Sequence, residues 1–358
     1  MGLTPQSQPD PAFWRGRRVL VTGHTGFKGA WLVYWLSKMG AYVAGLALAP
    51  STRPSLFDLL ELKRRCEHHE GDIRNAALVQ RVINEFRPEV VMHLAAQALV
   101  RESYHTPVET FASNVMGTVH VLDAIRRMDD TRVAVMVTTD KVYRNREWVW
   151  PYREDDPLGG RDPYSASKAA SEMAIDCWRQ SFFTDSGVAV ASARAGNVIG
   201  GGDWSPDRLL PDAVTAWLSG RELSVRRPHA VRPWQHVTEP LAGYLVLAQY
   251  LWKKPERAGA YNFGPNPDEA ASVRAVIELA RRVWPEGRVF YGDGSEGPHE
   301  AGLLSLDSSR ARLDLGLAPR LHLAGSVSLA MHWYKAHAEG AQAAALCDAD
   351  LQAWESLA

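Results

Sequence analysis

The chain has 358 residues, of which 46% are hydrophobic and 23% charged, and its formal net charge at pH 7 is −1. This length suffices for two packed lobes, the charge balance argues against a nucleic-acid partner, and no apolar run is long enough to span a membrane. The polar, Pro-rich N-terminus lacks the apolar core of a signal peptide, so we expect a cytoplasmic protein. Three cysteines (Cys66, Cys177 and Cys347) have no metal-ligand spacing; we expect them to be reduced, with no bound metal.

The first half of the chain alternates short β-branched runs with amphipathic stretches. Strands are predicted at 17–23, 41–48, just before 71–73, and at 89–97, 131–140 and 187–197. Helices are predicted at 29–40, 77–88, 107–128 and 162–181. This alternation predicts a parallel sheet covered on both faces, which is a Rossmann-type doubly wound α/β fold.

From residue 198 the sequence becomes rich in Gly, Pro, Asp and Trp between short helices. We interpret 1–197 as a dinucleotide-binding Rossmann domain and 198–358 as a smaller, loop-rich α/β lobe that binds the substrate. Part of the chain is expected to cross back to the first domain around 231–262. The Ala-rich end, 336–358, is expected to form a surface helix or a frayed tail.

A glycine-rich loop lies between the first predicted strand and the first predicted helix. Its sequence is Gly23-His24-Thr25-Gly26-Phe27-Lys28-Gly29. Glycines allow a tight turn and a close approach of backbone to a pyrophosphate, and the following helix offers free N–H groups to that anion. The loop therefore predicts a dinucleotide site.

Tyr164 and Lys168 form a Y-x-x-x-K pattern near the start of the helix predicted at 162–181. Residues four apart share a helix face, so the phenol and the ammonium are expected to lie together. Asp162 is a suitable N-cap and Pro163 a suitable first residue of this helix. We expect the nearby ammonium to lower the pKa of Tyr164 and to make it a general base.

A second group of polar residues ends the fifth predicted strand, as Thr138-Thr139-Asp140-Lys141. The carboxyl ends of strands carry the chemistry in doubly wound folds. Thr139 can hold a substrate hydroxyl. The adjacent Asp140 and Lys141 provide an acid and a base, and an elimination of water needs both.

These motifs resemble the extended short-chain dehydrogenase/reductase family, in which Asp72-Ile73 and Leu94-Ala95-Ala96 also match cofactor-binding positions. Three longer stretches resemble its sugar-nucleotide 4,6-dehydratase branch: TTDKVYRNREWVWPYREDDPLGGRDPYSASKAASE, RAGNVIGGGDWSPDRLLPD and RPWQHVTEPLAGY. The similarity extends over roughly 15–335. Lys141, followed by Asn145-Arg146-Glu147-Trp148, points to the members that act on CDP-glucose.

The resemblance implies a bound NAD. It places Asp72-Ile73 near the adenine, Leu94-Ala95-Ala96 near the nicotinamide ribose, and Thr138, Tyr164 and Lys168 also at the cofactor. The second strand ends without a carboxylate for the adenosine ribose, and Arg53 could meet a 2′-phosphate, so NADP stays open. NAD is favoured because the implied reaction is redox-neutral. The residues implied at the substrate are Arg101, Ser103, Asn197, Arg208, Leu209, Arg232 and His299.

The implied reaction is an internal redox elimination, so the protein would be a lyase. Tyr164 would take the proton of the sugar 4-hydroxyl during hydride transfer to NAD⁺. Lys141 would remove the C5 proton, which requires a neutral amine with a lowered pKa. Asp140 would protonate the departing 6-hydroxyl, and hydride would return to C6. The division of roles between Asp140 and Lys141 comes from the resemblance alone.

Two other functions remain open at this point. A 4-epimerase, or another sugar-nucleotide dehydratase of the same fold, would use the same Tyr and Lys, although an epimerase does not need Asp140 and Lys141. A non-catalytic, cofactor-sensing scaffold would not need to keep both Tyr164 and Lys168. By analogy with the family we expect a homodimer or homotetramer, formed through the helices near 107–128 and 162–181.

Overall fold

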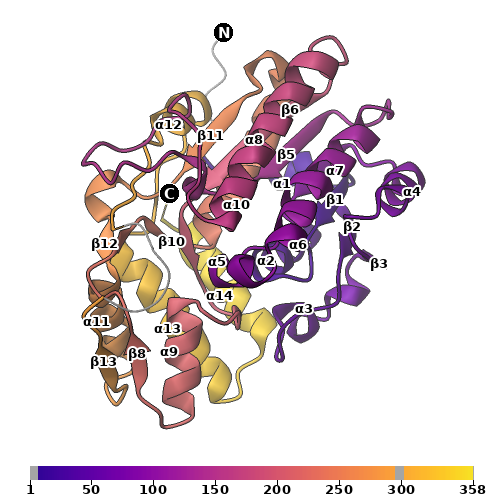
Figure 1. Cartoon of the computed structure of the whole chain (residues 1–358). Helices are drawn as coiled ribbons and strands as arrows, with labels where there is room; N and C mark the ends of the chain where they lie inside the picture. Colours follow the sequence, from indigo (N-terminus) through magenta and orange to yellow (C-terminus); the bar gives the residue numbers. More distant parts are fainter. Residues whose placement is uncertain (1–6, 295–301, 358) are drawn as a thin grey trace.

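The computed structural model describes residues 7–294 and 302–357. In these residues a seven-stranded parallel sheet forms the centre of the molecule, in the order β11-β6-β5-β4-β1-β2-β3 (Figure 1). The strands are β1 Arg18–Thr22, β2 Tyr42–Ala47, β3 Glu67–Glu70, β4 Val90–His93, β5 Val133–Val137, β6 Ala189–Ala195 and β11 Ala260–Phe263. Strand order reverses between β1 and β4, as in Rossmann-type folds. The predicted doubly wound α/β fold is confirmed.

Helices cover both faces of this sheet because alternate strand residues point to opposite sides. Val19 and Val21 of β1 join one hydrophobic cluster with residues of α2 (Phe27–Lys38) and α10 (Thr238–Lys253). Leu20, between them, joins a second cluster. That cluster contains residues of α4 (Ala76–Phe86), α7 (Gly117–Ile125) and α8 (Pro163–Phe182). The short helices are α1 Pro11–Trp14, α3 Leu56–Leu59, α5 Val100–His105, α6 Pro107–Phe111 and a π-helical turn, Ala112–Met116.

Three strands end earlier than the sequence predicts. After His93 the chain leaves the sheet, because the Ala95 and Gln97 amides donate to the side chains of Thr22 and Asn114. After Val137, Thr139 caps a 3₁₀ turn, Asp140–Val142. The strand predicted at 187–197 is divided, since residues 197–199 form β7 and pair with a different strand, β10 (Trp234–His236).

The rest of the chain builds a smaller, loop-rich part beside the carboxyl edge of the sheet. Its two-stranded sheets pair β7 with β10, β8 (Leu223–Val225) with β13 (Val289–Tyr291), and β9 (Val231–Arg232) with β12 (Ala271–Ser272). Its helices include α9 Leu209–Leu218, α11 Val273–Val283 and α12 Ser309–Leu315. The chain returns to the large sheet at 238–263, where α10 packs on β5 and β11 pairs with β6.

The C-terminal helices are α13 (Leu323–Ala338) and α14 (Ala343–Glu355). The expected helix forms in this segment, whereas a frayed tail is wrong for it, because one face of α14 packs against the first lobe. Trp354 is 1% exposed and meets Trp35 of α2 with ring centroids 5.6 Å apart. Asp348 of α14 accepts a 2.7 Å hydrogen bond from the Tyr34 hydroxyl. No helix in the described ranges combines the length and apolarity needed to cross a bilayer.

Candidate active site

The glycine loop leads from β1 into α2 and has the backbone shape that a pyrophosphate site requires. Gly23 has φ +75°, and a Cβ there would lie 2.7 Å from the backbone nitrogen of Ala95. A Cβ on Gly29 would lie 2.1 Å from the Gly23 carbonyl oxygen. Gly26 caps α2 without a side-chain hydrogen bond, so the first N–H groups of the helix are left for an anion.

His24 is the exception in this predicted cofactor loop. Its ring is fully buried, with Nε2 2.7 Å from Nδ1 of His68. It packs so closely on β2 that a Cβ on Gly45 would lie 2.3 Å from it. Burial, with the charge of His68, lowers the pKa of His24 to about 3. The His24 side chain is therefore turned into the core, and a contact of His24 with the cofactor stays a prediction for its backbone.

The other loop side chains are tied to neighbouring elements. Thr25 donates a 2.9 Å hydrogen bond to the Leu48 carbonyl at the end of β2. Phe27 is partly exposed. Lys28 Nζ donates to the Tyr244 hydroxyl of α10 at 3.1 Å. Burial, reinforced by the charges of Arg208 and Lys168, lowers the pKa of Lys28 to about 7.

The remaining predicted cofactor residues follow other strands at the same carboxyl edge. Asp72, after β3, accepts hydrogen bonds from the backbone and side chain of Arg74. Ile73 is buried against Gly117. Leu94, Ala95 and Ala96 follow β4. Thr138, after β5, donates to the buried Glu172 carboxylate of α8.

Tyr164 and Lys168 lie in the first turns of α8, as predicted. Asp162 caps the helix by accepting from the Ser165 amide at 2.9 Å. The Tyr164 side chain is buried and shares a hydrogen bond with Thr139. Lys168 Nζ donates to the Val137 carbonyl at 3.2 Å. The loop, the phenol, the amine and Thr139 are thus brought to one edge of the sheet.

The pKa of Tyr164 departs from the expectation. Burial raises it to about 12, although the Thr139 hydrogen bond and the Arg208 charge act to lower it. The predicted lowering by Lys168 is therefore wrong for this structure, because desolvation of the phenolate dominates. Burial also lowers the pKa of Lys168 to about 8, opposed by the charge of Glu172. Lys168 can therefore exchange a proton near neutral pH.

Asp140 and Lys141 are adjacent but occupy different environments. Asp140 is 1% exposed, accepts a 2.9 Å hydrogen bond from the Thr139 hydroxyl at Oδ1, and has no described partner at Oδ2. Lys141 is partly exposed and lines the main cavity. An unpartnered buried carboxyl oxygen is available to a polar ligand at that point.

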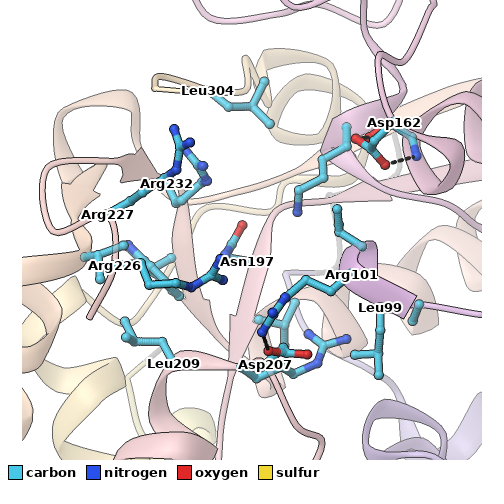
Figure 2. Close-up of a pocket in the computed structure, with 18 of the residues that line it drawn as sticks. Leu99, Arg101, Asp162, Asn197, Asp207, Leu209, Arg226, Arg227, Arg232 and Leu304 are labelled. Carbon is cyan, nitrogen blue, oxygen red and sulfur yellow. Dashed lines mark hydrogen bonds and ion pairs between the residues drawn. The ribbon is translucent and has the colours of Figure 1, made fainter. Parts of the chain in front are cut away.

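The main cavity of the described residues has a volume of about 530 Å³ and lies between the two parts of the chain (Figure 2). Its wall contains six residues predicted at the catalytic centre or substrate: Lys141, Arg101, Asn197, Arg208, Leu209 and Arg232. Asn197 Oδ1 is buried without a described hydrogen-bond partner, as expected of a group that binds a polar ligand. Asp162 and Leu304 lie on the opposite side from Leu209.

Of the described residues predicted at the substrate, Ser103 is not on this wall. Ser103 is fully buried; its hydroxyl donates to the Val100 carbonyl and accepts from the Tyr164 amide at 3.2 Å. The prediction that Ser103 contacts the sugar is therefore wrong, and it instead fixes the start of α8. His299 lies outside the described residues.

Several site residues were missed by the sequence reasoning. Arg226 and Arg227 also line the cavity. Asp207 pairs with Arg101, whose Nη1 lies 2.5 Å from its Oδ1, and Asp203 lies 3.6 Å from Arg208 Nε. Both aspartates belong to the stretch RAGNVIGGGDWSPDRLLPD. The two carboxylates within five residues of Arg208 in that stretch were the available signal.

A buried ion pair behind the site was also missed. Arg194 of β6 donates to Glu172 of α8 at 2.8 Å, and both side chains are at most 5% exposed. Arg194 also donates to the Tyr143 hydroxyl at 2.9 Å, and Ser192 donates to Glu172 at 2.8 Å. This network ties the catalytic helix to the strand ends beside it.

The fold and this site define an extended short-chain dehydrogenase/reductase. A family model described as GDP-mannose 4,6 dehydratase matches residues 20–282. The chain is 46% identical to a CDP-glucose 4,6-dehydratase of Salmonella typhimurium, over 92% of this chain and 94% of that protein. It is 28% identical to a dTDP-glucose 4,6-dehydratase of Xanthomonas campestris, over 88% and 92% of the two chains. The chain belongs to the GDP-mannose 4,6 dehydratase family.

Solved structures agree on the fold. A UDP-glucose 4-epimerase of Thermotoga maritima, solved with UDP-glucose, matches with a TM-score of 0.78 and 20% identity, over 90% of this chain and 99% of that one. A dTDP-glucose 4,6-dehydratase of Bacillus anthracis, in complex with NAD, matches with a TM-score of 0.76 and 22% identity, over 90% and 98%. At these identities the likeness concerns the fold alone.

Proposed function

We propose that this protein is an NAD-dependent hydro-lyase that converts CDP-glucose to CDP-4-keto-6-deoxyglucose and water. The observation that carries the proposal is the end of β5, where a buried acid, Asp140, stands beside an amine, Lys141, that reaches the cavity. An elimination needs both a proton donor and a base. The 46% identity to the Salmonella CDP-glucose 4,6-dehydratase supports the choice of nucleotide.

The residues present fit a dinucleotide. The crowded positions of Gly23 and Gly29 and the uncapped start of α2 form a cradle that added side chains would fill. These residues would hold the pyrophosphate, and Lys168 would orient the nicotinamide ribose. Bound NAD would supply a hydride acceptor for C4 and a donor for C6, so that the overall reaction is redox-neutral.

The chain's own side chains move the protons. Tyr164 accepts the proton of the sugar 4-hydroxyl, assisted by the Thr139 hydrogen bond and the Arg208 charge, which both lower the pKa of the phenol. Lys141 takes the C5 proton, which the 4-ketone makes acidic, and returns it to C5 after hydride has reached C6. Asp140 donates a proton to the 6-hydroxyl, which leaves as water. The proton that Tyr164 takes from the 4-hydroxyl balances the one that Asp140 gives up, and exchange with solvent restores both groups. Asn197, Arg208 and Arg232 bind the diphosphate, because guanidinium and amide N–H groups suit phosphate oxygens.

The purified protein with NAD should be incubated separately with CDP-glucose, dTDP-glucose, UDP-glucose and GDP-mannose, and the products followed by NMR. We expect a 4-keto-6-deoxy sugar from CDP-glucose and little from the others. Inversion at C4 without loss of water would instead identify an epimerase. Turnover of another nucleotide sugar would overturn the substrate, and turnover of none would favour a cofactor-sensing scaffold.

We further propose a homodimer formed through the outer face of α5, α6 and α8. Large apolar side chains are exposed there: Tyr104, Val108, Phe111 and Met116, together with Met173 and Phe182 of α8. Exposed apolar groups gathered on neighbouring helices are typical of a protein interface. Light scattering should give a dimer that Met173→Glu converts to monomers. A tetramer dissociating to dimers in this variant would also place an interface here, whereas an unchanged assembly would exclude this face.

A further inference from the structure

Arg101 and Asp207 form an ion pair at the edge of the main cavity. Arg101 lies on α5, which follows β4 of the large sheet, whereas Asp207 lies in the loop between β7 and α9. Both residues line the cavity, and Arg101 Nη1 lies 2.5 Å from Asp207 Oδ1 (Figure 2). The two residues are 106 positions apart in the sequence. The ion pair therefore joins the two parts of the chain beside the cavity.

The geometry of the pair leaves Arg101 able to bind a second anion. Its contact with Asp207 is made through Nη1. A guanidinium carries five N–H donors in a fixed fork, so Nε and Nη2 can still donate to a phosphate oxygen. Asp207 thus fixes the direction of the guanidinium without using all of its donors.

Stability of the fold does not account for this ion pair. Its side chains are 44% and 35% exposed, and exposed ion pairs contribute little to folding. Asp207 also has φ +59°, a left-handed conformation that residues other than Gly, Asn and Asp rarely adopt. The loop therefore uses, at the point where the carboxylate reaches Arg101, a backbone conformation that few residue types other than Asp adopt.

Asp207 is one of three aspartates near the two arginines. Asp203 lies 3.6 Å from Arg208, and Asp212 lines the cavity at the start of α9. Burial and the charges of Asp207 and Asp203 raise the pKa of Asp212 to about 6. Asp207 is the member of this group that contacts Arg101.

We propose that Asp207 is a positioning residue that holds Arg101 at the edge of the cavity so that Arg101 can bind the diphosphate of the nucleotide sugar. This inference rests on the proposed function for the substrate, but its main readout is nucleotide binding. Asp207 then affects the affinity for the nucleotide only through Arg101.

The test compares Asp207→Asn, Arg101→Gln and the double variant in the NAD-loaded protein. Asparagine tolerates the left-handed backbone, so Asp207→Asn removes the charge while keeping the loop. We expect each single change to raise the Kd for CDP and the KM for CDP-glucose about tenfold, with kcat within about twofold. Because both act on one contact, the double variant should be no worse than either single one.

The matched control is Asp130→Asn, which removes the carboxylate from an exposed pair with Arg87 away from the cavity. It should change neither Kd nor KM. Unchanged CDP affinity in Asp207→Asn, or losses that add fully in the double variant, would overturn the proposal. If Asp207→Asn folds poorly, Asp207→Gly, which also suits the backbone, gives the same comparison. Wild-type protein that binds CDP but does not turn over CDP-glucose would refute the function and leave the positioning role to be decided by Kd.

Discussion

The Thr139 hydroxyl donates a 2.9 Å hydrogen bond to Asp140 Oδ1, while Oδ2 of the same carboxyl is buried without a described partner. Oδ1 is therefore held in place by Thr139, and Oδ2 can bind a ligand. Thr139 also contacts the Tyr164 phenol, so the residue that holds the acid also touches the base. In the proposed mechanism, this arrangement places the first proton transfer and the protonation of the leaving hydroxyl beside one side chain, Thr139.

Replacing Asp140 by Asn should block loss of water but not the earlier steps. The amide keeps the shape of the side chain but cannot donate a carboxyl proton. We expect kcat to fall about 10²–10³-fold, the usual effect of losing a general acid. Substrate incubated in deuterated water should still exchange its C5 hydrogen, as followed by NMR. Turnover close to that of the wild type would contradict the acid role of Asp140.

Lys141→Gln should block the earlier step, removal of the C5 proton. Without the amine, the base proposed for the C5 proton is lost, so both C5 exchange and water loss should fall by about 10²-fold or more. The control is Lys38→Gln, which removes a surface lysine paired with Asp348. Release of the 6-hydroxyl at a normal rate in Lys141→Gln would show that Lys141 is not the base.

The buried His93 predicts a loss of stability in acid. Its ring lies 2.7 Å from the Thr22 hydroxyl and 3.1 Å from that of Thr118. Burial, with the charge of Lys168, lowers its pKa from 6.5 to about 3. The unfolded chain thus binds the proton more tightly, so the stabilisation is complete above pH 6.5 and is lost as the pH falls toward 3.

The expected slope for His93 is at most about 1.4 kcal/mol per pH unit within this window. Urea unfolding of His93→Gln between about pH 5 and 6.5, values within that window, should show a shallower pH dependence than the wild type. His24 should supply a second contribution of the same sign, because its pKa is also lowered to about 3. His332→Gln, at an exposed histidine, serves as the control. Equal slopes of unfolding free energy against pH in the wild type, His93→Gln and His332→Gln would contradict the prediction.

The C-terminal helix is expected to be part of the folded core. Trp354 is buried against Trp35, and the Arg320 guanidinium lies 4.1 Å from its ring centroid. Trp354→Ala should lower the free energy of unfolding by about 3–5 kcal/mol, because a large cavity remains. Leu357→Ala, at a side chain 49% exposed, should change it by less than about 0.5 kcal/mol. Equal stability of the two variants in denaturant would show that α14 does not support the fold.

The parts of the site predicted from the sequence are those whose residues are close along the chain. The glycine loop, Tyr164 with Lys168, and Asp140 with Lys141 each occupy a few consecutive positions, so spacing alone indicates their geometry. The contacts that were missed join distant segments: Arg101 meets Asp207 across 106 positions, and Arg194 meets Glu172 across 22. Such pairs depend on how the elements pack.

The inward turn of His24 and the incorrect predictions have the same origin. His24 turns inward because Gly45 of β2 leaves room for its ring, which only the packed sheet reveals. The pKa of Tyr164 follows from its burial, which a four-residue spacing cannot report. The Ala-rich end gave no sign of burial, yet Trp354 within it meets Trp35 on α2.

Pairing of β11 with β6 has a consequence for dissecting the molecule. A fragment ending at residue 197 would contain the glycine loop and Tyr164 but would lack both β11 and α10, which covers β5 and β6. Its terminal strand would then present unsatisfied backbone groups and an uncovered apolar surface, the usual origin of strand-to-strand aggregation. The cofactor half is therefore not a transferable module, and chimeras that exchange nucleotide preference should graft loops into the intact chain.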